Sequence, residues 1–365
     1  MMADFYELDF LEVHTKKSGD AIAIRYEQWG QTSIHVVDAG YAATGDTLVA
    51  HIRQYYANPE KIDHVVVTHP DQDHAEGIIK ILENFEVGTL WMNRPWVHAA
   101  EMIHYFPTCN SIPHIESRLH RLYPYLDDIE KLAIEKGIDI RDAFQGASIG
   151  AFTVLAPTRQ RFIELVAHSD RTPEVIEEAR GTNWFGLDAL VEVAKKAIAY
   201  IQMGWGEERF SPESTSNENE MSVVQFAQLN GDKILLTADA GRDGLDEAAD
   251  YAPLAGITLP GITRFQAPHH GSRRNVSTEI LDRWLGERLP EAPEEGKGHF
   301  TAIISAARED PDHPRKATIR GLRHRGARVL STGDGRGTKH LYRNAPEREG
   351  WTPANSLSYP TDQED

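Results

Sequence analysis

Short β-rich runs alternate with helical patterns in the first part of the sequence. The runs at 21–26 and 34–37 precede a segment, 47–56, in which apolar residues recur at helical spacing. A further apolar run at 65–68 is followed by a second helical pattern around 78–82. Alternation of short strands with helices is typical of layered packing, so the predicted fold class is α/β.

From about 96 to 215 the pattern changes. Residues 114–136 and 187–202 carry long helical repeats, and one β-like run at 152–155 lies between them. Segment 203–220 is rich in Gly, Ser, Glu and Asn, a composition typical of an exposed loop. We therefore expect a mainly helical insertion at about 96–215 over an α/β scaffold.

β-rich runs return after Ser222. Two of them flank Asn230-Gly231, a pair suited to the positive φ angles of a tight hairpin. The chain beyond Arg343 is rich in Pro, Glu and Asp and is expected to fray. We predict one domain over 1–343 and a flexible tail at 344–365. The later strands are expected at 223–226, 234–237, 263–267, 302–305 and 329–330, with a helix at 314–326.

The segment directly after the run at 65–68 has an unusual composition. Thr68-His69-Pro70-Asp71-Gln72-Asp73-His74 places two imidazoles and two carboxylates within six consecutive positions. Such groups are costly at the edge of a core, and metal ligation is the usual way to stabilise them. A solvated polar turn would explain any one of these residues but not the whole cluster.

Two other strand ends carry candidate ligands. Asp239 follows the run at 234–237, and His269 and His270 follow Pro268. A single Asp after a strand is usually a turn former or a helix cap. Three such positions in one chain favour a site assembled at the ends of strands, where α/β folds place their functional loops.

With these positions, the sequence outside the insertion resembles the metallo-β-lactamase-fold hydrolases. Asp38-Ala39-Gly40 matches the early Asp-Gly turn of that superfamily, and His69-x-Asp71-x-Asp73-His74 matches its ligand loop. Asp239 corresponds to the metal-bridging carboxylate and His270 to the late histidine.

One departure from the superfamily pattern points to a particular branch. Asp71 stands where the ligand loop usually has a second histidine, which resembles the hydrolase domain of ComEC-type DNA-uptake proteins. Further motifs shared with that branch are Gly19-Asp20-Ala21, Asn219-Glu220-Met221-Ser222, Pro268-His269-His270-Gly271-Ser272 and His313-Pro314.

The resemblance implies an αββα sandwich that holds two divalent metal ions, zinc or manganese. One ion would be surrounded by His69, Asp71, Asp239 and Asn219, and the other by Asp73, His74, Asp239 and His270. Many relatives have another histidine in place of Asn219. The residue types agree with this reading, because Asp71 makes the site rich in oxygen and suits Mn²⁺ as well as Zn²⁺.

A dimetal-activated water is the expected nucleophile, and Asp73 is placed to orient it. His269 and His313 are candidate catalytic residues, although both could instead orient metal ligands. Ser272, Arg273 and His313 are candidate phosphate contacts. The expected function is a metal-dependent phosphodiesterase or nuclease. The alternatives are a hydrolase of a small ester or phosphoester, and a hydrolase module active only with a partner protein.

Composition limits the partners. The net charge of −18 argues against a protein that coats nucleic acid nonspecifically. A local basic patch is still predicted, although a basic helix face is more often simply solvated. Nucleic acid is the expected partner at this patch, which consists of Arg315, Lys316, Arg320, Arg323, Arg325 and Arg328.

The helical insertion is the candidate surface for a protein partner or a second copy of the chain. Aromatic side chains in or beside it would be the anchors, although such residues are more often core. They are Trp91, Trp96, Trp184, Phe185 and Trp205.

The cellular location is expected to be the cytoplasm. The N-terminus has no basic region followed by an apolar core, so no signal peptide is predicted. No apolar run approaches the roughly 20 residues that cross a membrane, so no membrane partner is expected. Cys109 is the only cysteine, which excludes an internal disulfide.

Overall fold

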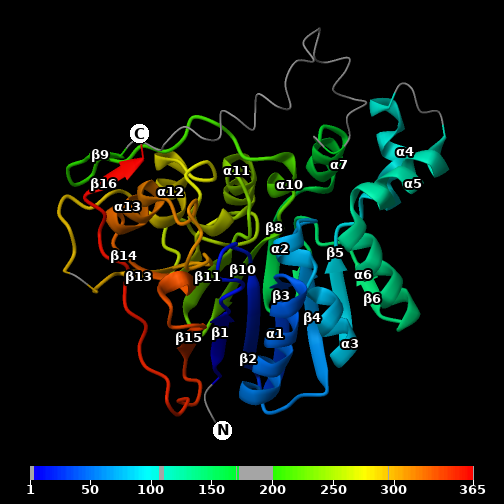
Figure 1. Cartoon of the computed structure of the whole chain (residues 1–365), viewed down its shortest axis with the longest axis horizontal. Helices are drawn as coiled ribbons and strands as arrows, with labels where there is room; N and C mark the ends of the chain where they lie inside the picture. Colours follow the sequence, from blue (N-terminus) through cyan, green and yellow to red (C-terminus); the bar gives the residue numbers. More distant parts are fainter. Residues whose placement is uncertain (1–3, 107–110, 170, 172–199, 295, 365) are drawn as a thin grey trace.

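The computed structural model describes residues 4–106, 111–169, 171, 200–294 and 296–364. Two seven-stranded sheets pack face to face, and helices cover the outer face of each sheet (Figure 1). The predicted αββα sandwich is therefore confirmed.

The first sheet is built mainly from the first half of the chain. Its antiparallel part joins β15, β1, β2 and β3, and its parallel part continues through β4 and β5 to β6. In spatial order the strands are β15 (Lys339–Arg343), β1 (Tyr6–Phe10), β2 (Ala21–Gln28), β3 (Gln31–Ala39), β4 (Lys61–Val67), β5 (Glu86–Met92) and β6 (Asp139–Arg141).

The second sheet is built mainly from the second half of the chain. β11 to β14 are parallel, and the opposite edge is antiparallel. In spatial order the strands are β14 (Ala327–Ser331), β13 (Phe300–Ile304), β12 (Arg264–Gln266), β11 (Asp232–Leu236), β10 (Val224–Leu229), β8 (Phe152–Ala156) and β7 (Ser148–Ile149).

The helices follow the strands in the order expected for an α/β chain. Those on the first sheet are α1 (Ala42–Tyr55), α3 (Ile78–Asn84) and α6 (Pro124–Glu135), and α5 (Ile112–Leu122) packs on α6. Those on the second sheet are α11 (Arg242–Tyr251), α12 (Thr278–Leu285) and α13 (Lys316–His324). The remaining short elements are α2 (Gln72–Ala75), α4 (Ala99–Met102), α7 (Arg159–Ala167), α10 (Asn217–Glu220) and the 3₁₀ turns Pro95–His98, Ile103–Tyr105, His269–Gly271 and Thr332–Asp334.

Alternation along each strand divides its side chains between two cores. On β2, Ile22 and Ile24 lie in the core between the sheets, whereas Ala21 and Ala23 pack under the helices. The last three residues of β4, Val65 to Val67, are buried on both sides in the same way, which explains this run of valines. Full burial of a large aliphatic side chain contributes about 1.5–3 kcal/mol, so both faces of the sheet stabilise the sandwich.

The predicted hairpin is confirmed. Asn230 and Gly231 have φ angles of 51° and 83°, and they join β10 to β11 with Leu229 opposite Asp232. Positive φ at both central positions matches the right-handed twist of the strands, and these two residue types tolerate it best.

The segment at 96–215 differs from the expected helical insertion. The predicted helix at 114–136 is two helices, which meet at Tyr123 and Pro124 because proline is accommodated only in the first turn of the second. The strand expected at 152–155 is confirmed, but it is β8 and pairs with β10 in the main sheet. The segment therefore contributes to the scaffold as well as covering it.

The rest of this region is only partly covered by the described residues. Of the helix expected at 187–202, residues 187–199 lie outside them, and 200–202 form the strand β9 (Tyr200–Gln202). β9 pairs with β16 (Asp362–Glu364), where Gln363 and Glu364 are buried. The end of the chain is thus packed against the body, in contrast to the frayed tail expected from its composition.

The aromatic residues considered as partner anchors lie mainly inside. Trp91 and Trp96 are buried, and Trp205 donates from Nε1 to the backbone oxygen of Leu289 at 3.0 Å. Trp184 and Phe185 lie outside the described residues. No described helix combines the length and apolar character needed to cross a bilayer.

His35 is an unusual component of the core between the sheets. It is fully buried beside Phe152 and His64, and its two ring nitrogens have no hydrogen-bond partner among the described residues. Burial and the neighbouring His64 hold the pKa of His35 well below its usual range, and nearby Gln225 offsets only part of this effect. The folded protein therefore keeps this imidazole neutral.

We predict that His35 makes the fold sensitive to acid. The unfolded chain binds a proton at this position below about pH 6.5, whereas the folded chain does not, so stability falls by about 1.4 kcal/mol per pH unit below that value. His35→Leu should lose less stability between pH 7 and pH 5 in urea denaturation than the unchanged protein. The exposed His114→Leu is the control, and equal losses in all three proteins would contradict the prediction.

Candidate metal centre

The strand ends converge at one end of the sandwich. Asp38 is the second-last residue of β3 and the ligand loop follows β4, whereas Asp239 follows β11 and His269 follows β12. Parallel neighbouring strands bring such ends together, and Figure 1 shows α2 and α10 at the same end of the two sheets. The backbone N–H of Val223 donates to the oxygen of Thr68 at 3.1 Å, which joins the two halves at this point.

Asp239 is the centre of the cluster. Its Oδ1 lies 3.3 Å from Nε2 of His74, and its Oδ2 lies 3.6 Å from Nε2 of His270. The same Oδ2 lies 3.7 Å from Nε2 of His269 and 3.8 Å from Nε2 of His69. Ligands bonded to one tetrahedral zinc at about 2.0–2.2 Å are separated by roughly 3.3–3.6 Å, so these spacings suit atoms that share an ion.

The other predicted ligands extend the cluster on both sides of Asp239. Asp71 Oδ2 lies 3.8 Å from Nε2 of His69, and Asp73 Oδ2 lies 3.4 Å from Nε2 of His270. We divide the donors by these pairwise distances into two adjoining donor sets that share Asp239. The first donor set is His69, Asp71, Asp239 and His269, and the second donor set is Asp73, His74, Asp239 and His270.

Asp20 lies beside the second donor set, although it is not among the ligands predicted from the sequence. Its carboxylate, together with donors of His74, Asp239 and His270, forms a group in which the atoms all lie within 4.8 Å of one another. Oδ2 accepts a hydrogen bond from Gln266 at 2.9 Å, whereas Oδ1 is buried without a partner. Burial raises the pKa of this carboxyl. The only signal in the sequence was the short Gly-Asp-Ala motif.

Hydrogen bonding shows that the residues fit a metal ion. Nε2 of His69, His74 and His270 and Oδ1 of Asp239 are buried and make no hydrogen bond within the described part of the chain. Leaving each such atom unsatisfied costs about 1–3 kcal/mol. Because these atoms face one another and are imidazole and carboxylate donors, a divalent ion such as zinc or manganese is the group that they suit.

Outer hydrogen bonds direct these donors inward. Asp38 Oδ2 lies 2.8 Å from Nδ1 of His74, and Thr68 Oγ1 lies 3.0 Å from Nδ1 of His69. Thr68 also donates to both oxygens of Asp38, from its backbone nitrogen at 2.9 Å and from its hydroxyl at 2.6 Å. With Nδ1 engaged on both rings, Nε2 is left to face the site, as is usual for metal-binding histidines.

His269 occupies the place that the sequence suggested for Asn219. Asn219 lies behind it, with Nδ2 2.7 Å from Thr215 Oγ1 and 3.1 Å from Nδ1 of His269. His269 and His270 have φ angles of 45° and 54°, and this local backbone turn directs two consecutive imidazoles towards Asp239. The structure thus brings His269 into the first donor set and places Asn219 outside it.

Burial and electrostatics set the protonation of the cluster. Although burial favours the neutral imidazole, Asp239 and Asp73 raise the pKa of His270 to about 9. Burial and the neighbouring His270 and His313 lower the pKa of His269 to about 4, despite the attraction of Asp239. Burial likewise opposes ionisation of Asp73, but His270 and His74 lower its pKa to about 2. Protons and divalent ions therefore compete for the same nitrogens.

The predicted substrate contacts are only partly near the centre. The His313 ring lies 5.3 Å from that of His269, centroid to centroid, and its Nδ1 is 3.3 Å from Asp310. Ser272 accepts a hydrogen bond on Oγ from the backbone nitrogen of the second residue after it, at 3.2 Å. Arg273 donates to the backbone oxygen of Glu364 at 3.4 Å, so its guanidinium is directed to the end of the chain.

The basic patch lies largely inside the protein. Arg320, Arg323 and Arg325 are buried, and Arg325 is paired with Glu208 and Asp282 at 3.1 and 2.6 Å. Arg320 donates to the backbone oxygens of Glu207, Gly204 and Pro360. Lys316 pairs with Asp362, Arg315 with Asp312, and Arg328 bonds the oxygen of Ala354. Sequence alone does not distinguish these buried cations from a surface patch.

Arg171 is a residue that sequence reasoning missed. Its Nη2 lies 2.5 Å from Oδ1 of Asp71, and its Nε lies 3.6 Å from Glu218. The guanidinium packs over the ring of Tyr123 with its carbon 5.6 Å from the centroid. Asp71 can therefore present Oδ2 to His69 while Oδ1 is held by a cation. No motif marks this position in the sequence.

The family comparison agrees with this geometry. Residues 19–108 match the model of the Metallo-beta-lactamase superfamily. This part of the chain is therefore similar to the metallo-β-lactamase superfamily. The match includes Asp38 and the whole ligand loop, whereas Asp239 and His270 lie beyond it. Members of this superfamily are generally hydrolases that bind divalent metals. The finer resemblance to the ComEC-type branch is not confirmed by the match.

Solved structures similar to this chain are distant. A metallo-β-lactamase candidate from Thermotoga maritima is 10% identical with a TM-score of 0.29, covering 64% of this chain and 79% of that chain. The hydrolase AbOPH of the β-lactamase superfamily is 11% identical with a TM-score of 0.27, covering 60% and 56%. A mutant of the CmlA β-hydroxylase is 12% identical with a TM-score of 0.35, covering 93% and 54%. No curated protein was found to match the sequence.

We predict that Asp239→Asn empties both donor sets. A neutral amide in place of the shared carboxylate removes one negative charge and one donor from each set. Metal content, measured by elemental analysis after purification and dialysis, should fall to the background of the assay. Asp243→Asn, an exposed change on the following helix, is the matched control. Full metal content in Asp239→Asn would contradict a bridging role.

The contrast between His269 and Asn219 gives a second prediction. His269→Ala should reduce metal content by up to one equivalent, because it removes a donor of the first donor set. Asn219→Ala should retain the metal and weaken its affinity by about 10–100-fold, as expected for a residue behind a ligand. Chelator competition measures both effects. Loss of metal from Asn219→Ala alone would reverse the assignment.

Proposed function

We propose that the protein is a metal-dependent hydrolase of phosphodiesters, with nucleic acid as the substrate class. The observation that carries this proposal is the pair of adjoining donor sets that share Asp239. Two divalent ions so placed supply Lewis-acid chemistry, acidify water and neutralise charge on attacking and leaving oxygens. The carboxylates Asp20, Asp71, Asp73 and Asp239 make the centre rich in oxygen, which supports manganese beside zinc.

The surrounding side chains have roles that follow from their positions. Asp73 is partly exposed and has a low pKa, so its carboxylate is ionised and able to orient water by accepting a hydrogen bond from it. His313 lies beside His269 with part of its ring exposed, in reach of a substrate but outside the donor sets. We assign it the donation of a proton to the leaving oxygen.

Arg171 supports an anionic substrate. Its side chain is about one-third exposed (36%) while it contacts Asp71, so a phosphate beside the first donor set would meet its guanidinium. Planar guanidinium groups suit phosphate through paired hydrogen bonds. This residue, rather than the buried arginines of α13, is the cation at the centre that a phosphodiester would reach.

A small phosphoester is the second candidate substrate. The arginines of α13 that suggested a track for a polymer are mostly buried, and the chain carries a net charge of −18. A long nucleic acid gains much of its affinity from a continuous cationic surface. Short substrates need no such surface, so they belong in the same assay. A requirement for a partner protein would appear there as metal-loaded but inactive enzyme.

Cleavage assays test the proposal. Labelled single- and double-stranded DNA and RNA, and bis(p-nitrophenyl) phosphate, are incubated with protein loaded with Mn²⁺ or Zn²⁺. We expect hydrolysis that Asp73→Asn reduces by more than the 10–100-fold typical of losing an outer-shell group. Asp243→Asn should retain full activity. Metal-loaded protein that cleaves none of these substrates would refute phosphodiesterase activity of the chain on its own.

A further inference from the structure

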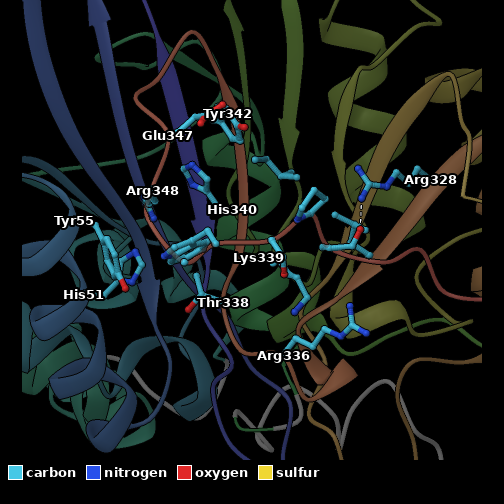
Figure 2. Close-up of a pocket in the computed structure, with 17 residues that line it drawn as sticks. His51, Tyr55, Arg328, Arg336, Thr338, Lys339, His340, Tyr342, Glu347 and Arg348 are labelled. Atoms are coloured by element: carbon cyan, nitrogen blue, oxygen red, sulfur yellow. Dashed lines mark hydrogen bonds between the residues drawn. The ribbon is translucent and has the colours of Figure 1, made fainter.

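A cleft of about 680 Å³ lies outside the metal centre (Figure 2). It is lined by residues of β14 and β15, by the C-terminal part of α1 and by the segment 347–354. No member of the two donor sets lines it. Sites for small molecules commonly occupy about 300–1,000 Å³, so the cleft is large enough to hold one.

Arg348 fixes the outer wall of this cleft. Its guanidinium donates to Asp9 at 2.8 and 3.0 Å and to Glu7 at 2.5 Å, and it lies 4.9 Å from the ring centroid of Trp351. Asp9 is fully buried and also lies 2.9 Å from Nε2 of His51. A buried network with all its charges paired is rigid. The wall is therefore preformed.

The charged groups of this network interact with one another and not with solvent. Burial opposes ionisation of Asp9, but hydrogen bonds from His340, His51 and Arg348 hold its pKa well below the usual range. Arg348 accordingly has no charge left for a ligand. Lys339, which also lines the cleft, is paired with Asp334 at 2.7 Å.

Two further arginines remain without an acidic partner. Arg328 donates to the backbone oxygen of Ala354, and Arg336 donates to the amide oxygen of Asn355 at 3.0 and 3.1 Å, but neither arginine forms an ion pair within the described part of the chain. Among the described residues that line the cleft, Glu347 is the one carboxylate. In a chain of net charge −18, such a pair of arginines creates a local positive potential that attracts an anion.

Aromatic side chains line the side of the cleft opposite these two arginines. Figure 2 shows Arg328 and Arg336 on one side of the cleft and Tyr55 and His51 on the other. Trp351 packs edge-on against Tyr55, with centroids 5.3 Å apart. A ligand that spans the cleft would therefore meet guanidinium groups at one end and aromatic surface at the other.

We propose that this cleft binds a small phosphorylated ligand that carries a planar ring, a nucleoside monophosphate being the representative. Arg328 and Arg336 bind the phosphate, because guanidinium groups offer it paired donors. Tyr55 and Trp351 contact the ring. This site is separate from the hydrolytic centre, and its existence does not depend on which substrate that centre cleaves.

Calorimetric titration with AMP tests this proposal on the full chain. We expect binding that weakens at least tenfold in Arg336→Gln and further in Arg328→Gln/Arg336→Gln. Arg288→Gln, whose side chain bonds the backbone of Gly206 elsewhere, is the control for loss of a positive charge. Arg336 is exposed, so its replacement should leave the fold intact, and thermal denaturation verifies this.

The hydrolytic centre is the competing location for AMP. Asp239→Asn should bind AMP as tightly as the unchanged protein does. A Kd weaker than about 1 mM for the unchanged protein would overturn the proposal. It would also be overturned if Asp239→Asn abolished binding while the arginine variants retained it. Inorganic phosphate that binds more weakly than AMP, with Tyr55→Ala removing the difference, would support the ring contact.

Discussion

The structure depends on one buried carboxylate. Asp239 follows β11 of one sheet, yet it faces histidines from the loop after β4 of the other sheet and from the turn after β12. Acids and imidazoles buried at such a junction cost free energy unless their charges and lone pairs are compensated. The two halves of the sandwich therefore come together around a site that needs a cation.

The backbone around this carboxylate is constrained as well. Asp38, Ala238, His269 and His270 all have φ between 45° and 54°, a region costing of order 1–3 kcal/mol for residues other than glycine. Hydrogen bonds compensate: Thr68 donates to Asp38, and the backbone nitrogen of His269 donates to the oxygen of Ala238 at 3.0 Å. Strained positions cluster where donors must point in directions that regular strands do not offer.

The sequence could predict what is encoded locally. The ligand loop, Asp239 and His270 were identifiable because polar donors directly follow apolar strands, and β4 and the hairpin at Asn230 were identifiable from pattern and turn chemistry. Side-chain directions and contacts between distant residues could not be predicted from the sequence. The direction of His269 depends on a positive φ angle, and Arg171 reaches Asp71 across 100 residues of chain. Arg320, read as a surface cation, is buried on backbone oxygens.

Unpaired atoms, rather than the mere proximity of ligand types, distinguish the metal centre from the rest of the protein. Donor atoms of Glu7, Asp9 and His340 also lie within 4.8 Å of one another. There, however, the guanidinium of Arg348 contacts both carboxylates, so the cation is already part of the chain. In the described residues no arginine or lysine pairs with Asp239, and Arg171 reaches only the outer oxygen of Asp71. Oδ1 of Asp239 and Nε2 of the facing histidines of the ligand loop have no hydrogen-bond partner there. In one cluster the buried negative charge is thus neutralised by an arginine side chain of the protein itself. In the other cluster it calls for an ion from solution.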